Sequence, residues 1–407
     1  MSGPNDASTS TTENSSPTTG RLRIGTRLLQ DAFGPDNVLL LRAGARIETQ
    51  RELKRLSEPG VRFGPDRGDQ IPFDMENEAA LDAASASTDP RAREFIDKVS
   101  KAAALKSEAV RDITSVFERI AAGGEVDLER AKSAVSMLLR NMLEDPRALV
   151  SLAALKDADA YTYTHSVNVG IMAMHLAMRT EYRDDVEEIG LGALMHDTGK
   201  MKIPLGVLNK PGRLDEDDWV IMRQHPTYGW EQLQQAGETR ESVLSCVLGH
   251  HEKVNGGGYP QGKRGGQITP FARLTAIADV YDALTTQRPY KTPMTSKEAL
   301  TLMARKMEGE LDRGLLECFI SIVGFYPVGS EVELSDGSVG TVLNHYATSP
   351  NRPSVILHTD ANGGEIPGSP VVDLNEHRGP TVTRFVDERR IQDIAREAVE
   401  AEARKAA

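Results

Sequence analysis

Apolar residues follow two different periods along this chain of 407 residues. From about 146 to 325 nearly every segment repeats them at helical spacing, and the same spacing runs from 91 to 142. After 325 apolar residues alternate with polar ones, as in "EVELSDGSVGTVL", where Asp336-Gly337 is a strong hairpin signal. The pattern predicts a mainly α protein: an all-helical core followed by a small β-rich unit.

The other segments suggest the domain boundaries. Residues 1–20 hold almost no apolar side chains, so burial cannot offset the entropy of ordering them. The predicted order is a disordered tail (1–20), a small α+β module (21–63), an acidic Ala/Ser-rich linker (64–90), a helical connector (91–145), the helical core domain (146–325), the β-rich unit (326–380) and a charged C-terminal helix (381–407).

Composition narrows the functional class. No stretch approaches the roughly 18 apolar residues of a membrane span, and the polar N-terminus lacks the form of a signal peptide, so we expect a cytoplasmic protein without a membrane partner. The cysteines, Cys246 and Cys318, lie among apolar neighbours and are expected to be reduced core residues. A net charge of −12 argues against a nucleic-acid polymer as partner, so an anionic substrate would need locally placed cations.

The stretch "HDTGK" carries the first candidate chemistry. A surface helix end would explain Gly199 and the lysines that follow it. It would not explain why His196 and Asp197 come directly after apolar residues, where ionisable groups are costly unless they are paired or bound to a metal.

Six of the nine histidines fall between 165 and 251. His175 lies about 80° around the helix axis from His165, so we interpret it as a packed or surface residue. The others, with two aspartates, lie at helix ends or on apolar faces: His165, His196, His225, His250, His251, Asp197 and Asp279. Such nitrogen and oxygen donors suit iron, manganese, zinc or nickel, and Asp197 could bridge two ions about 3.5–4 Å apart.

Other catalytic motifs fit less well. "HEKVN" has Asn255 in place of the second histidine of a zinc-protease motif, and "GGYPQGKR" has Arg264 where a P-loop needs Ser or Thr. A G-x-S-x-G elbow is also missing from the sequence.

Five motifs together resemble a known family. "HSVNV", "HDTGK", "HP", "HHEKVNGGGYP" and "IADVYDALTTQRPYK" occur in the order found in the HD-GYP domain, a bacterial branch of the HD metal-phosphohydrolases. The resemblance covers about 175 residues in the middle of the chain. It implies an all-helical domain with two or three metal ions that hydrolyses cyclic di-GMP to linear pGpG, and in some members on to GMP.

The family pattern assigns roles to individual residues. It implies that one metal is held by His165, His196, Asp197 and Asp279, and that Asp197 bridges to a second held by His225, His250 and His251. Lys200 is then both a catalytic and a phosphate-binding cation, and Arg288 and Lys291 form a second phosphate clamp. The loop with Gly258, Tyr259 and Pro260 borders the substrate and is implicated in binding diguanylate cyclases; Glu252 is a candidate partner for an imidazole.

One position departs from the pattern. Three-metal members carry a glutamate four residues before the first histidine, and this chain has Tyr161 there. We therefore expect two divalent ions, with iron or manganese favoured over nickel or zinc, and attack on the phosphodiester by a bridging hydroxide. A homodimer is compatible with this expectation.

Two rival functions remain open. The first is an HD hydrolase that acts on another nucleotide, such as an alarmone or a deoxynucleotide. The second is a receptor or interaction platform that binds cyclic di-GMP without hydrolysing it. A weaker third possibility is that the β-rich unit binds a ligand of its own.

Overall fold

The computed structural model describes residues 32–33, 39–41, 54, 56, 62–63, 90–154, 161–210, 212–286, 293–346, 348–376 and 379–387. The chain divides into two units, Met1–Ala79 and Ala80–Ala407. The predicted tail lies outside the described residues, as do 64–89 of the predicted linker. None of the helices in the described ranges is both long and apolar enough to cross a membrane.

The first unit contains a small antiparallel sheet in the order β2-β1-β3. Its strands are β1 (Ala32–Phe33), β2 (Leu39–Leu41) and β3 (Arg62–Phe63). Ala32 pairs with both neighbours and is fully buried. This sheet lies within the segment 21–63 that was predicted as a small α+β module.

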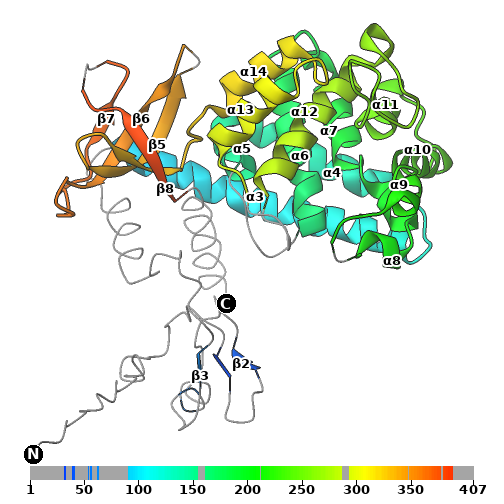
Figure 1. Ribbon diagram of the computed structural model, residues 1–407, viewed down its shortest axis with the longest axis horizontal. Coiled ribbons are helices and arrows are strands. Elements are labelled where there is room, and N and C mark those ends of the chain that lie inside the picture. The colour runs from blue at the N-terminus through cyan, green and yellow to red at the C-terminus, as the bar shows by residue number, and fades with distance from the viewer. Residues whose placement is uncertain are drawn as a thin grey trace, which may run out of the picture. The chain divides into compact units, whose positions relative to one another are not determined.

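Helices make up the first and larger part of the second unit (Figure 1). They are α3 (Pro90–Ala121), α4 (Leu128–Glu144), α5 (Pro146–Ala154), α6 (Tyr161–Met178), α7 (Val186–Leu194), α8 (Leu205–Leu208), α9 (Glu216–Met222), α10 (His225–Gln235), α11 (Glu241–Gly249), α12 (Pro270–Thr285), α13 (Ser296–Lys306) and α14 (Arg313–Val323). Three short 3-10 helices join them: η2 (Arg183–Asp185), η3 (Thr198–Lys202) and η4 (Gly265–Gln267).

Helix α6 runs through the centre of this domain. It is apolar on nearly all sides, which is typical of a helix enclosed by others, and its residues from Val167 to Ala177 are buried. Glycine lets α7 approach it closely, because a Cβ at Gly170 would lie only 2.4 Å from Leu194 Cδ1. The all-helical core predicted from the sequence is confirmed.

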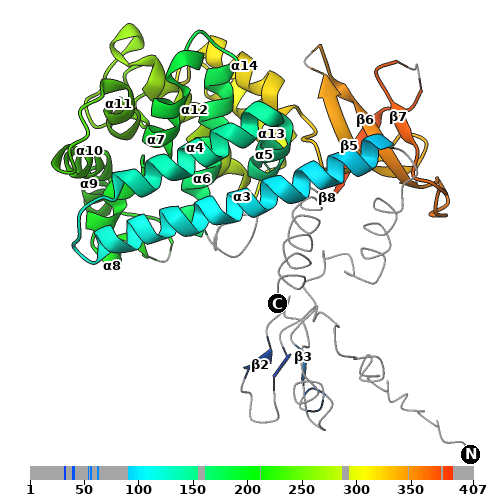
Figure 2. The ribbon, with the colours of Figure 1, turned by 180° about the vertical axis from the view of Figure 1, so that it is seen from behind.

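Helices α3 and α4 belong to the same core. Figure 2 shows them side by side along one face of the domain, and Phe117 of α3 and Leu138 of α4 are fully buried in the cluster that contains Leu194 and Ile277. The segment 91–145 was interpreted as a connector, whereas its apolar faces are covered by the domain that follows it. Sequence spacing gives a helix an apolar face but not the partner that covers it.

Five antiparallel strands form a sheet at the C-terminal end of the described chain, in the order β7-β6-β5-β4-β8. They are β4 (Glu331–Leu334), β5 (Val339–Tyr346), β6 (Ser349–Thr359), β7 (Val371–Asp373) and β8 (Val382–Asp387). Val332, Val342 and Val355 form its own small core with Tyr326. The expected hairpin joins β4 to β5, with Gly337 at a φ of 87°.

The predicted C-terminal helix over 381–407 needs one correction. Its first residues form β8, which pairs with β4. Val382 and Phe385 pack against the sheet core, and this anchorage outweighs the high charge of the segment. Residues 388–407 lie outside the described residues.

Candidate metal centre

Five separate segments of the helical domain supply one buried cluster. His165 lies in α6, and Asp279 lies in the middle of α12. His196 and Asp197 follow α7 directly, and His225 is the first residue of α10. His250 and His251 come after α11. The donor atoms fall into three groups, each within 4.8 Å: His225, His250, His251; His165, His196, Asp279; and His196, Asp197, His250.

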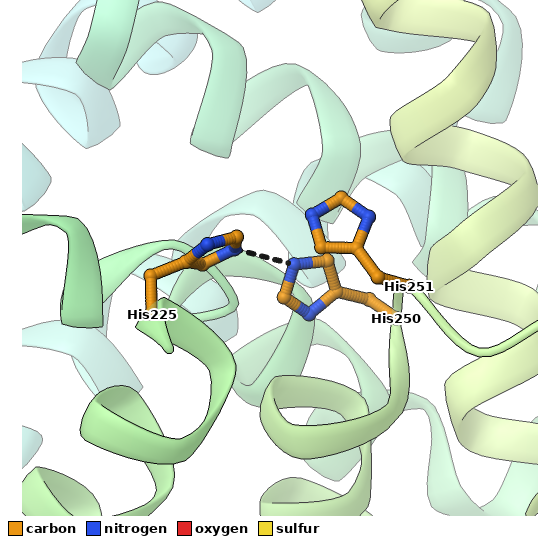
Figure 3. Close-up of side chains that lie close together, drawn as sticks. All are labelled: His225, His250 and His251. Carbon is orange, nitrogen blue, oxygen red and sulfur yellow. Dashed lines mark hydrogen bonds between the residues drawn. The ribbon is translucent and has the colours of Figure 1, made fainter. Parts of the chain in front are cut away.

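Three of these histidines are oriented by the same backbone contact. The Nδ1 atoms of His196, His225 and His250 lie 2.7–2.8 Å from the carbonyl oxygen of the residue three positions earlier. A carbonyl only accepts, so each Nδ1 carries a proton. In His225 and His250, whose pKa values burial lowers, Nε2 then presents a lone pair. Figure 3 shows His225 and His250 with these nitrogens turned toward each other, 3.2 Å apart. Two lone pairs so placed favour a cation beside them.

The fourth ring is oriented by a carboxylate. His165 Nδ1 lies 2.7 Å from Asp282 Oδ2, which also accepts a hydrogen bond of 3.0 Å from the hydroxyl of Thr286. Its Nε2 faces Asp279 Oδ1 at 3.2 Å. Asp282 was not identified from the sequence, although its position three residues after Asp279 on one helix face was a usable signal. Carboxylate partners of this kind orient metal-bound imidazoles.

Asp197 lies between the two sets of rings. Its Oδ2 atom lies 3.4 Å from His196 Nε2 and 3.7 Å from His165 Nε2. Its Oδ1 atom lies 3.4 Å from His225 Nε2 and 3.9 Å from His250 Nε2. Each oxygen of one carboxylate therefore faces a different pair of histidines.

The protonation of the cluster is set by burial and by the two aspartates. Burial lowers the pKa of His225 to about 3 and that of His251 to about 4. Burial acts on His165 in the same direction, but Asp282 and Asp279 outweigh it and raise that pKa to about 9. Burial opposes ionisation of Asp197, yet Lys200 and His196 hold its pKa well below the usual range. The site is thus built to hold positive charge.

The donor set fits divalent metal ions. His196 Nε2 and Asp197 Oδ1 are buried and have no hydrogen-bond partner among the described residues. Leaving such atoms unpaired is costly, and metal coordination would satisfy both. Neither cysteine belongs to the three donor groups. Cys246 is buried, with a pKa that burial raises to about 12, and Cys318 is partly buried; both are free.

Glycine permits the close packing that places His196 and Asp197. A Cβ on Gly199 would lie 1.9 Å from the carbonyl oxygen of His225 and 2.5 Å from the nitrogen of Gly229. Gly199 thus allows η3 to touch the start of α10, which brings two candidate ligand segments together. Its φ is not positive, so close approach is the reason for glycine here.

Lys200 and the glycine-rich loop border the cluster. Lys200 Nζ lies 2.5 Å from Asp197 Oδ2. The Tyr259 ring stacks on His251 with centroids 4.7 Å apart, and Pro260 follows it. A Cβ on Gly258 would lie 2.3 Å from Lys253 N.

Glu252 has a role other than the predicted one. Its carboxylate accepts hydrogen bonds from the backbone N–H groups of Gln261 and Lys263, at 2.7 and 3.0 Å. It therefore fixes the loop after Pro260, and no hydrogen bond joins it to an imidazole within the described ranges. His175 is buried in α6 and belongs to none of the three donor groups, as interpreted from its place around the helix.

Three residues of the sequence prediction are not placed. Arg288 and Lys291 lie in 287–292, outside the described residues. Tyr161 begins α6, but its side chain is not among those described.

The chain is similar to known families and proteins. Residues 139–315 match the model of the HD domain, and residues 331–394 match that of a KOW domain associated with the HD domain. The chain is 35% identical to a cyclic di-GMP phosphodiesterase of Pseudomonas aeruginosa over 87% of each protein. It is 34% identical to a 3'3'-cGAMP-specific phosphodiesterase of Vibrio cholerae, over 40% of this chain and 35% of that protein.

A solved structure is also similar. An HDG"Y"P protein from Bdellovibrio bacteriovorus is 22% identical and matches with a TM-score of 0.46, covering 73% of this chain and 95% of that one.

Proposed function

The chain belongs to the HD-GYP family of HD-domain phosphohydrolases, and on this premise we propose that it hydrolyses cyclic di-GMP at the histidine and aspartate cluster. The substrate is inferred from the relative that matches along most of the chain, which is named a cyclic di-GMP phosphodiesterase. The expected product is linear pGpG, with further hydrolysis to GMP as an additional step.

The geometry of Asp197 carries this proposal. One carboxylate oxygen faces His165 and His196, and the other faces His225 and His250. One metal ion would be held by His165, His196, Asp197 and Asp279, and the second by Asp197, His225, His250 and His251. Iron or manganese is favoured by this set of nitrogen and oxygen donors. When bound, such ions supply Lewis-acid activation of water and offset the charge of the phosphodiester.

The chain's own residues orient the reacting groups. Backbone carbonyls and Asp282 fix the imidazole rings, so the coordinating nitrogens are preorganised before any ion binds. Lys200 Nζ stands at Asp197, where it can donate to a phosphate oxygen as a compact charge. We assign Arg288 and Lys291 to a second phosphate clamp. Tyr259, next to His251, would then line the substrate side with Gly258 and Pro260.

Local charge reconciles this substrate with an acidic protein. The net charge is −12, whereas the cluster would hold divalent cations and lies beside Lys200. A dianionic dinucleotide responds to the local field at the cluster and not to the overall charge.

Product analysis tests the proposal. Anaerobically purified, metal-quantified protein would be incubated with cyclic di-GMP and, separately, with 3'3'-cGAMP, because several relatives are named for the second compound. Linear pGpG or GMP, with about two metal ions per chain, supports the proposal. Faster turnover of 3'3'-cGAMP would change the substrate. Binding of cyclic di-GMP without any product, with both ions present, would contradict hydrolysis and support the receptor function.

A further inference from the structure

Helix α9 places an exposed aromatic side chain near the metal centre. The helix buries none of its residues, and Trp219 and Val220 are 43% and 63% exposed. A single exposed apolar side chain is ordinary on a protein surface, so the case for Trp219 rests on the residues beside it.

The start of α9 is nevertheless held in place. Asp215 caps the helix by accepting a hydrogen bond of 2.9 Å from Asp218 N, and Asp218 completes a capping box. Lys210 Nζ contacts both carboxylates, at 2.7 Å to Asp215 Oδ2 and closely to Asp218. Trp219 is therefore presented from a fixed helix, although the core does not anchor it.

A continuous row of ring contacts links Trp219 to the cluster. The Arg223 guanidinium lies over the Trp219 ring, 5.9 Å from its centroid, and over the Tyr259 ring, 5.6 Å from its centroid. Tyr259 in turn stacks on His251, with centroids 4.7 Å apart and an interplanar angle of 30°. Arg223 thus lies two ring contacts from a candidate metal ligand, and Trp219 lies three contacts from it.

Arg223 is exposed and takes part in none of the ion pairs found among the described residues. Its N–H groups are therefore available to a ligand. The planar guanidinium can stack on an aromatic ring and donate two parallel hydrogen bonds at its edge. Guanine offers two acceptors, O6 and N7, that match this edge, whereas adenine has an amino donor in place of O6.

We propose that Trp219 and Arg223 form a guanine-binding subsite beside the metal centre, with Trp219 stacking on one base of the substrate and Arg223 donating to O6 and N7. This inference rests on the proposed function and adds a determinant of base specificity. Stacking on an aromatic ring would hold either purine, so the preference for guanine comes from Arg223.

The subsite is tested by comparing substrates with and without a purine. The kcat and KM values would be measured with cyclic di-GMP, cyclic di-AMP and bis(p-nitrophenyl) phosphate for Trp219→Ala, Arg223→Ala and Arg223→Lys. Val220→Ala and Arg213→Ala serve as matched controls, since both residues are exposed and lie on or just before α9.

The expected result is a loss confined to the nucleotides. Arg223→Ala should raise KM for cyclic di-GMP by about 10- to 100-fold and reduce its preference over cyclic di-AMP, and Arg223→Lys should not restore that preference. Trp219→Ala should raise KM for both nucleotides. All variants should hydrolyse bis(p-nitrophenyl) phosphate at close to the wild-type rate. The two control variants should also keep wild-type kinetics with both nucleotides. Unchanged nucleotide kinetics, or an equal loss on all three substrates, would overturn the subsite.

Failure of the proposed function gives a different result. If the wild type hydrolyses no cyclic dinucleotide, equilibrium binding of GMP to the metal-loaded protein replaces the kinetic test. Weaker GMP binding by Arg223→Ala than by Arg213→Ala would then keep the subsite, and equal binding would overturn it.

Discussion

The two ends of helix α6 each bury one histidine, and the two rings behave in opposite ways. The pKa of His165 is raised to about 9, and that of His175 is lowered to about 4. Burial lowers both values, since it penalises the charged form. At the first end Asp282 and Asp279 outweigh burial, whereas at the second end Arg179 and His345 add to it.

The difference shows what raises the pKa of a buried histidine. Both rings belong to one apolar helix, so neither the helix nor the degree of burial distinguishes them. The distinction comes from α12, which brings Asp279 and Asp282 against His165. Carboxylates that favour a proton on Nε2 also favour a metal ion there.

Asp197→Ala should have the largest effect. It removes the carboxylate whose two oxygens face the His165–His196 pair and the His225–His250 pair. We expect activity to fall by about 1,000-fold or more and the metal content to fall below two ions per chain. Product analysis and elemental analysis of the same sample would measure both. Asp184→Ala, at a side chain that is 95% exposed, is the control. A fully active Asp197→Ala protein that still binds two metal ions would refute the role of Asp197 as a ligand shared by both ions.

Lys200→Ala should reduce kcat/KM by about 100-fold while the metal content is kept, because the lysine is assigned to the phosphate. Steady-state kinetics beside metal analysis would measure this. Lys202→Ala is the matched control, since that lysine belongs to the same short helix but faces Glu231, with Nζ 3.9 Å from Oε2. Loss of metal together with activity would instead assign Lys200 to holding Asp197 in place.

Asp282→Asn should make His165 behave more like His175, with a lower pKa and weaker affinity for a metal ion. It keeps the shape of the side chain but removes the charge that raises the pKa of His165. We expect metal affinity to fall by about 10- to 100-fold, measured by competition with a chromophoric chelator. Thr286→Val, which removes the hydroxyl that donates to Asp282, should have a smaller effect. Equal affinity in all three proteins would refute the role of Asp282.

His175→Gln should change only the pH dependence of stability. The unfolded ring binds a proton near its ordinary pKa of 6.5 and the folded ring near 4, so the unfolded state holds more protons in between. Stability is therefore full above 6.5 and falls as the pH drops toward 4, by about 1.4 kcal/mol per pH unit at most.

The measurement is denaturant unfolding of the metal-free wild type and variant from pH 7 to pH 4. The variant should lose about 1–3 kcal/mol less than the wild type over this range, with unchanged activity at pH 7. Parallel curves for the two proteins would show that His175 does not contribute.

Much of the helical domain could be predicted from the chain. The switch from helical to alternating spacing near 326 was located correctly, and the family was identified from five ordered motifs. The seven candidate metal ligands were found because each stands at a helix end or on an apolar face, and the structure brings their donor atoms together. Their assignment to two ions stays a prediction.

Other features needed the packed chain. The partner of Asp282 is His165 on another helix, and the reason for Gly199 is the close approach of η3 to α10. The charge of the segment after 380 suggested a helix, but its first residues pair with a strand some 50 positions earlier. No local pattern in the sequence records that contact.

Helical spacing and motif order are local properties of the chain, so they were enough to predict the type of fold, the candidate donor atoms and the family. The packing of the helices decided which buried histidine has a raised pKa and which has a lowered one, and which arginine stands over the tyrosine beside His251. The physical reason is that charge interactions and ring contacts depend on distances between helices, and those distances are fixed only when the apolar faces pack together.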